Sequence, residues 1–328
     1  MKNSNLFFDS DISTEILDNK NIVIIGYGNQ GRAQALNLRD SGFNVTVALR
    51  NDSPSISRVI EDGLKYGQID KVICDADIVC LLVPDSEAPK VFNRYIKSHL
   101  KEGSALLFSH GYNIHYNLIN YPNNVDIIMV APSGGGAMVR KEYSNKSGVP
   151  ALLAVEQNFT GGGLELVKAY GKAIGSSRIC TFLSTFKEET ETDLYGEQVL
   201  LTGGIPMMIE KSLKVLLEDG YSPVVAWFVC YYEVKMIVDL FHEKGIEYLY
   251  KAISDTARYG GLKVGDYLID DEYEIKLKKV LSDIKTGEFK KDLEKNIDNK
   301  SYTSSINSKH VEEFSNIMNV LFEKNKNS

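Results

Sequence analysis

The run Asn21-Ile22-Val23-Ile24-Ile25-Gly26-Tyr27-Gly28-Asn29-Gln30-Gly31 decides the fold of the first half of this chain. Residues 21–25 are an apolar stretch of strand length, typical of a parallel strand that is buried on both faces. The three glycines satisfy G-x-G-x-x-G, in which the first allows a tight turn, the second admits a pyrophosphate and the third lets the next helix pack closely. A tight turn without a ligand is the alternative, so the neighbouring segments must decide.

The next strand favours a dinucleotide site. It is expected over 44–49 and ends at Arg50, where dinucleotide-binding domains place the residue that selects the ribose. An acid at this place favours NAD, and a basic group favours NADP. Arg50, Ser53 and Ser55 offer a guanidinium and two hydroxyls to a 2′-phosphate, so NADPH is preferred to NADH as the cofactor, with Asp52 as the one discordant charge.

Alternating strands and helices predict a Rossmann-type, doubly wound parallel sheet. The expected helices are 32–41, 57–64, 90–100 and 164–174, and the further strands are 78–83, 105–108, 126–130 and 150–155. Beyond residue 183 the strand-like runs stop, and the helical segments are 185–201, 206–218, 223–242, 246–258, 271–286 and 311–323. We therefore expect an α/β nucleotide-binding domain over 1–182 and an all-helical domain over 183–328.

Ligands of such a sheet bind beyond the carboxyl ends of its strands. Three stretches at strand ends are therefore expected at the cofactor: Pro84 with Asp85, His110, and Gly136 in a triple-glycine loop. For His110, a loop histidine that is hydrogen-bonded to the backbone is the alternative. For the glycines, the alternative is a flexible turn.

An acidic stretch, residues 185–198, begins the helical half. On a helix, Glu189, Asp193 and Glu197 stack at i, i+4 and i+8, where like charges repel and a cation would compensate them. Mg²⁺ prefers carboxylate oxygens and is the candidate ion. The alternative is a solvated helix start, because acids in a first turn suit the helix dipole and a capping box.

A second acid lies in the most apolar helical segment, residues 223–242. This segment has almost no polar face near its start, so it is expected in a core or between subunits. Glu233 in its middle should then meet a cation, a metal or metal-bound water. Pairing with a lysine of another helix is the alternative.

Composition excludes several function classes. A net charge of −7 and a pI near 5.4 argue against a nucleic-acid partner. No apolar run is long enough for a membrane span, and the acidic N-terminus does not resemble a signal peptide. The four cysteines, expected as buried free thiols, lack metal-site spacing and indicate a cytoplasmic protein.

These residues together resemble the short, class I ketol-acid reductoisomerases. The resemblance rests on the glycine loop, on residues 35–42, on His110-Gly111-Tyr112-Asn113-Ile114-His115, on 186–198 and on 235–240. It implies a nucleotide-binding domain, a knotted all-helical domain and active sites completed across a homodimer or higher homo-oligomer. It also implies Mg²⁺-dependent alkyl migration in a small oxo acid, 2-acetolactate or its ethyl homologue, followed by reduction with NADPH in branched-chain amino-acid biosynthesis.

The same resemblance assigns the metal site. It implies that Asp193 and Glu197 are metal ligands, that Glu189 supports them, and that Glu233 of a partner subunit holds metal-bound water. His110 would lie near the nicotinamide, and Ser254 would bind the substrate carboxylate.

Four positions depart from the family pattern. The family has lysine where this chain has Ser133, and glutamate where it has Val229. The family's glycine-loop histidine is Ala137, and an acid is replaced by Arg258. Three hypotheses follow: a reductase of small oxo acids or related C=O or C=N groups with an impaired isomerase step, an authentic ketol-acid reductoisomerase, and a non-catalytic nucleotide-binding paralogue.

Overall fold

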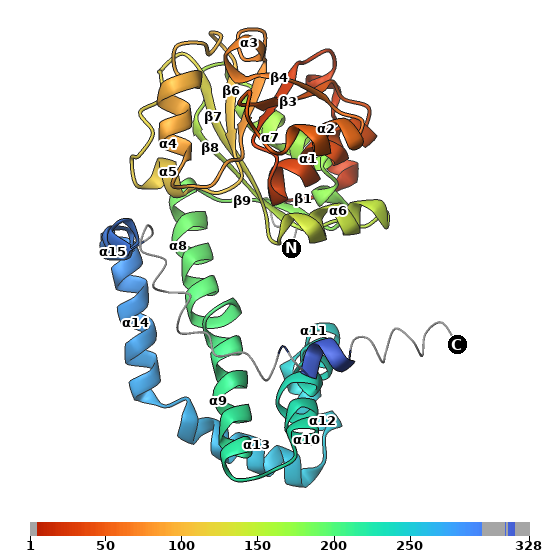
Figure 1. Cartoon of the computed structure of the whole chain (residues 1–328), viewed down its shortest axis with the longest axis vertical. Coiled ribbons are helices and arrows are strands. Elements are labelled where there is room, and N and C mark those ends of the chain that lie inside the picture. The colour runs from red at the N-terminus through yellow and green to blue at the C-terminus, as the bar shows by residue number, and fades with distance from the viewer. Residues whose placement is uncertain (1–4, 297–311, 313, 319–328) are drawn as a thin grey trace. The chain divides into compact units, whose positions relative to one another are not determined.

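A computed structural model describes residues 5–296, 312 and 314–318 of the 328-residue chain. The chain divides into two compact units, Met1–Thr190 and Glu191–Ser328, and the division falls inside helix α8 (Phe186–Gly196). Figure 1 shows the first unit as a sheet flanked by helices and the second as helices alone. The expected domain boundary near residue 183 stays a prediction.

The first unit is built on a nine-stranded sheet with the order β1-β9-β8-β7-β6-β5-β2-β3-β4. The strands are β1 (Leu6–Phe7), β2 (Ile22–Ile25), β3 (Val45–Leu49), β4 (Lys65–Gln68), β5 (Ile78–Leu81), β6 (Ala105–Phe108), β7 (Asp126–Pro132), β8 (Ala151–Gln157) and β9 (Thr181–Leu183). Strand β2 is fully buried and lies parallel to β3 on one side and to β5 on the other. The strand order reverses there, so the predicted Rossmann-type topology is confirmed and a ligand crevice is expected at the carboxyl end of β2.

The sheet is mainly parallel, as expected, and also contains antiparallel pairings. Strand β8 runs antiparallel to β7, and β1 runs antiparallel to β9. The connection from β7 to β8 contains α6 (Gly136–Ser144), which packs against α1 (Asn29–Asp40). The backbone N–H of Ser133 donates to the Pro150 carbonyl at 2.8 Å, so this connection begins and ends at the same end of the two strands. A chain that returns at the same end must reverse direction.

Two hydrophobic layers cover the sheet because successive side chains of β2 point to opposite faces. Ile22 and Ile24 pack with α1 and with α7 (Gly163–Ala173). Val23 and Ile25 pack with α4 (Ala88–Val91) and with the π-helical turn η3 (Phe92–Ile96). Both core layers are thus set by one apolar strand.

Several short elements of the first unit were not predicted from the sequence. They are β4, β9, α3 (Ile69–Val72), α5 (Tyr112–His115), α6, and the 3₁₀ turns η1 (Asp9–Asp11) and η4 (Ser176–Arg178). The expected helix over 57–64 appears as α2 (Ile56–Glu61), and a 3₁₀ turn η2 (Glu15–Leu17) precedes β2. Apart from the nine-residue α6, the elements that were not predicted have only three or four residues and lack the periodicity that identifies longer ones.

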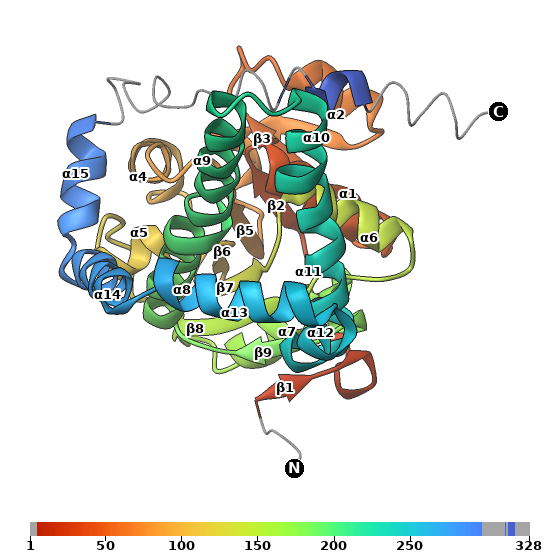
Figure 2. The ribbon, with the colours of Figure 1, turned by 90° about the horizontal axis from the view of Figure 1, so that it is seen from below.

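The described part of the second unit is helical. Its elements are the π-helical turn η5 (Glu197–Leu201), α9 (Gly204–Glu218), α10 (Pro223–Trp227), the π-helical turn η6 (Phe228–Tyr232), α11 (Glu233–Lys244), α12 (Ile246–Ala252), α13 (Asp255–Leu268), α14 (Asp271–Thr286) and α15 (Glu288–Asn296). Helices α9 and α10 lie side by side in Figures 1 and 2. The segment expected as one helix over 246–258 is broken, because Ser254 is extended and caps α13. The helix expected over 311–323 lies mostly outside the described residues.

The apolar segment around Glu233 is not a core helix of its own chain. Ala226 and Trp227 are buried, but Val224, Val225 and Val229 are exposed. Trp227 donates its indole N–H to the Ser315 hydroxyl at 3.1 Å. Of the two expected environments, a core and a subunit interface, the described residues supply the first only around Ala226 and Trp227.

No helix among the described residues is long and apolar enough to cross a membrane. All four cysteines are free thiols, as expected. Their burial differs from the expectation, because Cys74 is exposed and only Cys80 is fully buried. Burial raises the pKa of the Cys80 thiol to about 12.

Candidate active site

The glycine loop between β2 and α1 leaves room for a ligand where the pattern requires it. Gly26 has φ +98°, and a Cβ there would lie 2.8 Å from the Leu82 carbonyl oxygen. A Cβ on Gly31 would lie 2.3 Å from the carbonyl oxygen of Gly26. A Cβ on Gly28 would meet nothing within 4 Å. The first and third glycines are thus needed for packing, while the second opens onto space, as a pyrophosphate cradle requires.

Tyr27 connects this loop to Asp62, which follows α2. Its hydroxyl donates to Asp62 Oδ2 at 2.7 Å, and Arg32 binds the same carboxylate through Nε and Nη2, each at 2.7 Å. The paired Arg32 guanidinium lowers the pKa of Asp62 to about 2. Burial, followed by the bond to Asp62, raises the pKa of Tyr27. The role of Tyr27 is therefore to anchor the loop through a bidentate ion pair.

A cleft of about 260 Å³ opens at the carboxyl ends of β2, β5 and β6. Its lining includes Gly28, Asn29 and Gln30 from the glycine loop, Pro84 and Asp85 after β5, and His110 and Asn113 after β6. Six residues predicted at the cofactor thus share one cavity. Burial raises the pKa of the Asp85 carboxyl, and the Glu189 charge raises it further.

The loop after β7 borders the glycine loop. Gln30 donates from Nε2 to the carbonyl oxygen of Gly134 at 2.9 Å. A Cβ on Gly136 would lie 2.0 Å from the Asn29 carbonyl oxygen, so only glycine fits this contact. The third glycine of this loop, Gly136, therefore makes a close backbone approach at the start of α6.

A chain of polar side chains, buried at Gln34 and Tyr170, joins these loops, and no sequence pattern predicted it. Tyr170 of α7 donates to Gln34 Oε1 at 2.9 Å, and Gln34 donates from Nε2 to Ser109 Oγ at 2.8 Å and to Gln30 Oε1 at 3.1 Å. The Cys80 thiol donates to the Tyr170 hydroxyl at 3.4 Å. Buried polar groups of this kind are stable only when they are paired, so the chain fixes the positions of the side chains that it joins.

Glu189 of α8 holds the loop that carries His110. Its Oε1 lies 2.9 Å from His110 Nδ1, and its Oε2 accepts the backbone N–H of Gly111 at 2.7 Å. Glu189 is only 3% exposed. Because an ionised carboxylate only accepts hydrogen bonds, this contact requires a proton on Nδ1. His110 is therefore held by the side chain of Glu189.

Three candidate ligand atoms meet at the beginning of α8, one each from His110, Glu189 and Asp193, all within 4.8 Å of one another. Asp193 follows Glu189 by one turn of the same helix and is exposed. The two carboxylates have the chemistry that a hard divalent cation requires, and the His110 Nδ1 is already bonded to Glu189. This donor set fits Mg²⁺, which the Asp193 and Glu189 carboxylates would hold.

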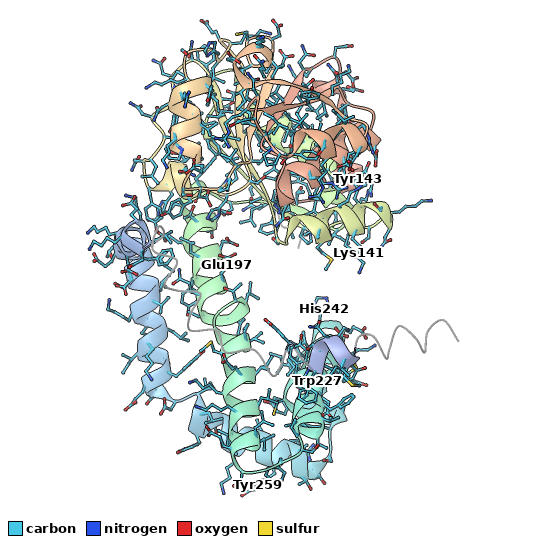
Figure 3. The ribbon with its side chains drawn as sticks, viewed as in Figure 1. Lys141, Tyr143, Glu197, Trp227, His242 and Tyr259 are labelled. Carbon is cyan, nitrogen blue, oxygen red and sulfur yellow. The ribbon has the colours of Figure 1, made fainter. Side chains whose placement is uncertain are left out.

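Glu197, labelled in Figure 3, is not part of that group. It is exposed and begins the π-helical turn η5. Glu233 is also exposed and directly follows the π-helical turn η6. Both acids therefore lie where the helix geometry is unusual. π-helical turns are rare overall, and those that occur are often found at functional sites.

A second cleft, of about 340 Å³, lies beyond β3 and contains Arg50 and Asp52. Ser53 and Ser55 do not line it, although they form the adjoining turn, in which the Ser55 N–H donates to Ser53 Oγ at 3.3 Å. Arg94 of η3 lines it as well and was not predicted. The sequence could not indicate Arg94, because it is brought there only by the position of η3 against the sheet.

The last three positions singled out from the sequence, Ser254, Ser133 and Val229, have uncharged side chains. Ser254 accepts the N–H of Ala257 at 3.2 Å as the N-cap of α13. Ser133 is exposed at the end of β7, and Val229 is 52% exposed in η6.

Comparison with known proteins identifies the family. Residues 16–180 match the model of the acetohydroxy acid isomeroreductase NADPH-binding domain, and residues 186–320 match that of the ketol-acid reductoisomerase C-terminal domain. The chain belongs to the ketol-acid reductoisomerase family. Members of this family are NAD(P)H-dependent oxidoreductases, and this chain is a reductase of that family.

The ketol-acid reductoisomerases (NADP(+)) of Methanocaldococcus jannaschii and Pyrococcus abyssi are 45% and 47% identical to this chain over 287 residues. That length is 88% of this chain and 87% and 86% of theirs. An NADH-preferring ketol-acid reductoisomerase from an uncultured archean matches the structure with a TM-score of 0.91 and 38% identity, over 96% of this chain and 98% of its own. Both nicotinamide cofactors thus occur among the similar ketol-acid reductoisomerases.

Proposed function

We propose that this protein uses NADPH and Mg²⁺ to reduce a small 2-oxo (ketol) acid or a related C=O or C=N substrate, and that its alkyl-migration step is impaired. One observation carries the proposal: the glycine loop and the His110–Glu189 pair are retained, whereas positions 133 and 229 offer no charge. NADPH would supply a hydride and Mg²⁺ would polarise the substrate oxygens.

The residues of the first unit have separate tasks in this scheme. The glycine loop binds the pyrophosphate, and Arg50 with its neighbouring hydroxyls binds the 2′-phosphate. Glu189 orients His110, whose imidazole lines the cleft and exchanges a proton with the substrate. Asp193 and Glu197 supply carboxylate oxygens for Mg²⁺.

The impaired step follows from charge. Alkyl migration develops more charge on the substrate oxygens than reduction does, so it depends most on cations and on the acids that hold them. The resemblance places a lysine and a glutamate at 133 and 229, and serine and valine cannot replace their charge. We therefore propose that migration suffers first.

We also propose that the cytoplasmic protein works as a homodimer or higher homo-oligomer in which Glu233 of the partner subunit holds metal-bound water, and Ser254 binds the substrate carboxylate. The exposed apolar side chains of α10 and η6, among them Val225 and Val229, support a subunit contact.

The test follows NADPH oxidation with Mg²⁺ on 2-acetolactate and on the already rearranged 3-hydroxy-3-methyl-2-oxobutyrate. We expect turnover of the rearranged acid and at least about a tenfold lower kcat/KM for 2-acetolactate. Efficient turnover of 2-acetolactate would overturn the proposal. Replacing Ser133→Lys together with Val229→Glu should raise the rate on 2-acetolactate and leave the rate on the rearranged acid unchanged. Repeating the assays with NADH tests the cofactor choice.

An authentic ketol-acid reductoisomerase is the second candidate. It is favoured by the similarity to curated ketol-acid reductoisomerases over 88% of the chain. In that case Arg258, or another cation, would replace the lysine. Efficient turnover of 2-acetolactate that is lost in Arg258→Ala would identify this candidate.

A further inference from the structure

One buried acceptor in the cofactor cleft has no partner. Asn113 of α5 is 2% exposed, and its Oδ1 forms no hydrogen bond within the described part of the chain. The same side chain lines the 260 Å³ cleft. Buried amide oxygens are nearly always paired, so an unpaired one at the wall of a ligand cleft points to a ligand that donates to it.

Asp85 fixes which end of the amide is unpaired. The Asn113 Nδ2 group donates to Asp85 Oδ1 at 3.1 Å across the cleft wall. Because the carboxylate accepts, the nitrogen end of the amide faces Asp85 and the oxygen end is left for another donor. The backbone of Asn113 is also held, since its carbonyl accepts the N–H groups of Leu118 and Ile119. The acceptor is thus preorganised from two sides.

The sheet topology indicates which part of a dinucleotide reaches this acceptor. The pyrophosphate belongs at the glycine loop after β2, and the adenosine belongs on the β3 side, where Arg50 lines its own cleft. The nicotinamide therefore lies on the other side, beyond β5 and β6, where Asp85 and Asn113 meet. The carboxamide is the group of this ring that carries N–H donors.

We propose that Asn113, oriented by Asp85, binds the carboxamide of the nicotinamide by accepting its N–H on Oδ1. This inference rests on the proposed function, since it requires a nicotinamide nucleotide in the cleft. The bond would fix the rotation of the ring about its glycosidic bond and so decide which face of the ring is turned toward the substrate. Asn113 is therefore a positioning residue for hydride transfer.

The wild-type protein provides the first test, by calorimetric titration with three ligands. They are NADPH, its reduced 3-acetylpyridine analogue, in which a methyl group replaces the amide nitrogen, and 2′-phospho-ADP-ribose, which lacks the nicotinamide ring. We expect the analogue to bind about tenfold more weakly than NADPH, because Oδ1 is left unpaired. Equal affinities for the two would mean that a water or nothing satisfies Oδ1, and would overturn the inference.

Two variants and a control locate the effect. In Asn113→Leu, NADPH and the analogue should bind with equal affinity, while the ring-free fragment binds as it does to the wild type. Asp85→Asn keeps Asn113 but no longer orients its amide, so the difference in affinity between NADPH and the analogue should become smaller. If Asn113→Leu does not fold, Asp85→Asn provides the test. Asn145→Leu, an exposed asparagine at the end of α6, should keep the wild-type discrimination.

The same titrations distinguish a failure of the proposed function from a failure of the proposed role of Asn113. Failure of all three ligands to bind the wild type would remove the proposed function itself. The other outcome is that the fragment and NADPH bind, and that Asn113→Leu and Asp85→Asn both still bind NADPH more tightly than the analogue. That outcome would contradict only the role of Asn113.

Discussion

Gln34 donates a hydrogen bond to Ser109 at 2.8 Å, so the helix that begins at the glycine loop also holds the strand end that carries His110. Gln34 is fully buried and bonds Gln30 and Tyr170 as well. One side chain thus couples the glycine loop to the strand end that carries His110.

Replacing Gln34→Leu should destabilise the protein by about 2 kcal/mol or more, because the buried Tyr170 and the half-buried Gln30 and Ser109 lose a bond at once. Nucleotide affinity should fall with it, since Gln30 and Ser109 are no longer fixed. Thermal unfolding and NADPH titration measure the two effects. Tyr170→Phe, which removes only one end of the chain, should cost about 1 kcal/mol. Equal stability losses in the two variants would contradict a central role for Gln34.

Replacing Glu189→Gln should lower kcat by about 10- to 100-fold with little change in the NADPH dissociation constant. The amide keeps the size of the side chain but removes the charge that orients His110 and supports a cation. Steady-state kinetics and direct titration separate the two constants. Glu188→Gln, an exposed neighbour that accepts from the Ser184 hydroxyl, is the matched control. A loss confined to NADPH binding would argue against the orienting role.

Replacing Gly111→Ala should lower both activity and stability, the latter by about 1–3 kcal/mol. The new Cβ would lie 2.5 Å from Thr190 Oγ1, 2.6 Å from the Phe186 carbonyl oxygen and 2.9 Å from Glu189 Oε2. The Glu189 contact to the loop must therefore move. Gly265→Ala, where a Cβ meets nothing within 4 Å, should be tolerated. Unfolding temperature and kcat are the measurements, and wild-type values for Gly111→Ala would show that the loop adapts.

The Asp62 ion pair should make stability depend on acid pH. Its pKa is about 2 in the folded protein against 3.8 for a free aspartate, so between these values the unfolded chain binds more protons. The stabilisation, about 1–2 kcal/mol once solvent screening is allowed for, is present above pH 4 and is lost as the pH falls toward 2. Asp62→Asn should be less stable at pH 7 and show a flatter acid limb in thermal unfolding. Glu61→Gln, the exposed neighbour, should keep the wild-type profile.

The parts of the fold that could be predicted have local patterns. The β2 run and its glycines determine a strand, a turn and a helix within a few residues, and the predicted α14 segment, 271–286, matches the structure. The direction of β8 could not be predicted, because it depends on where α6 packs, and α6 begins with glycines that carry no helical pattern.

The candidate site divides in the same way. Strand ends and motif spacing predicted His110, Asp85 and the glycine loop in one cleft. Gln34 and Asn113 were missed, because a single polar residue in an amphipathic or short segment has no signal until its partners in other elements are known. The burial expected for Glu233 was not found within the chain, since an apolar helix can be covered by a second chain as well as by its own.

The backbone bond from Ser133 to Pro150 bears on how this protein diverged. Position 133 is anchored to the sheet through its main chain, while its side chain is exposed and makes no demand on the core. A substitution there alters the chemistry presented at the strand end and leaves folding almost untouched. New substrate preferences can therefore be sampled at this position by single mutations, without a stability threshold standing in the way.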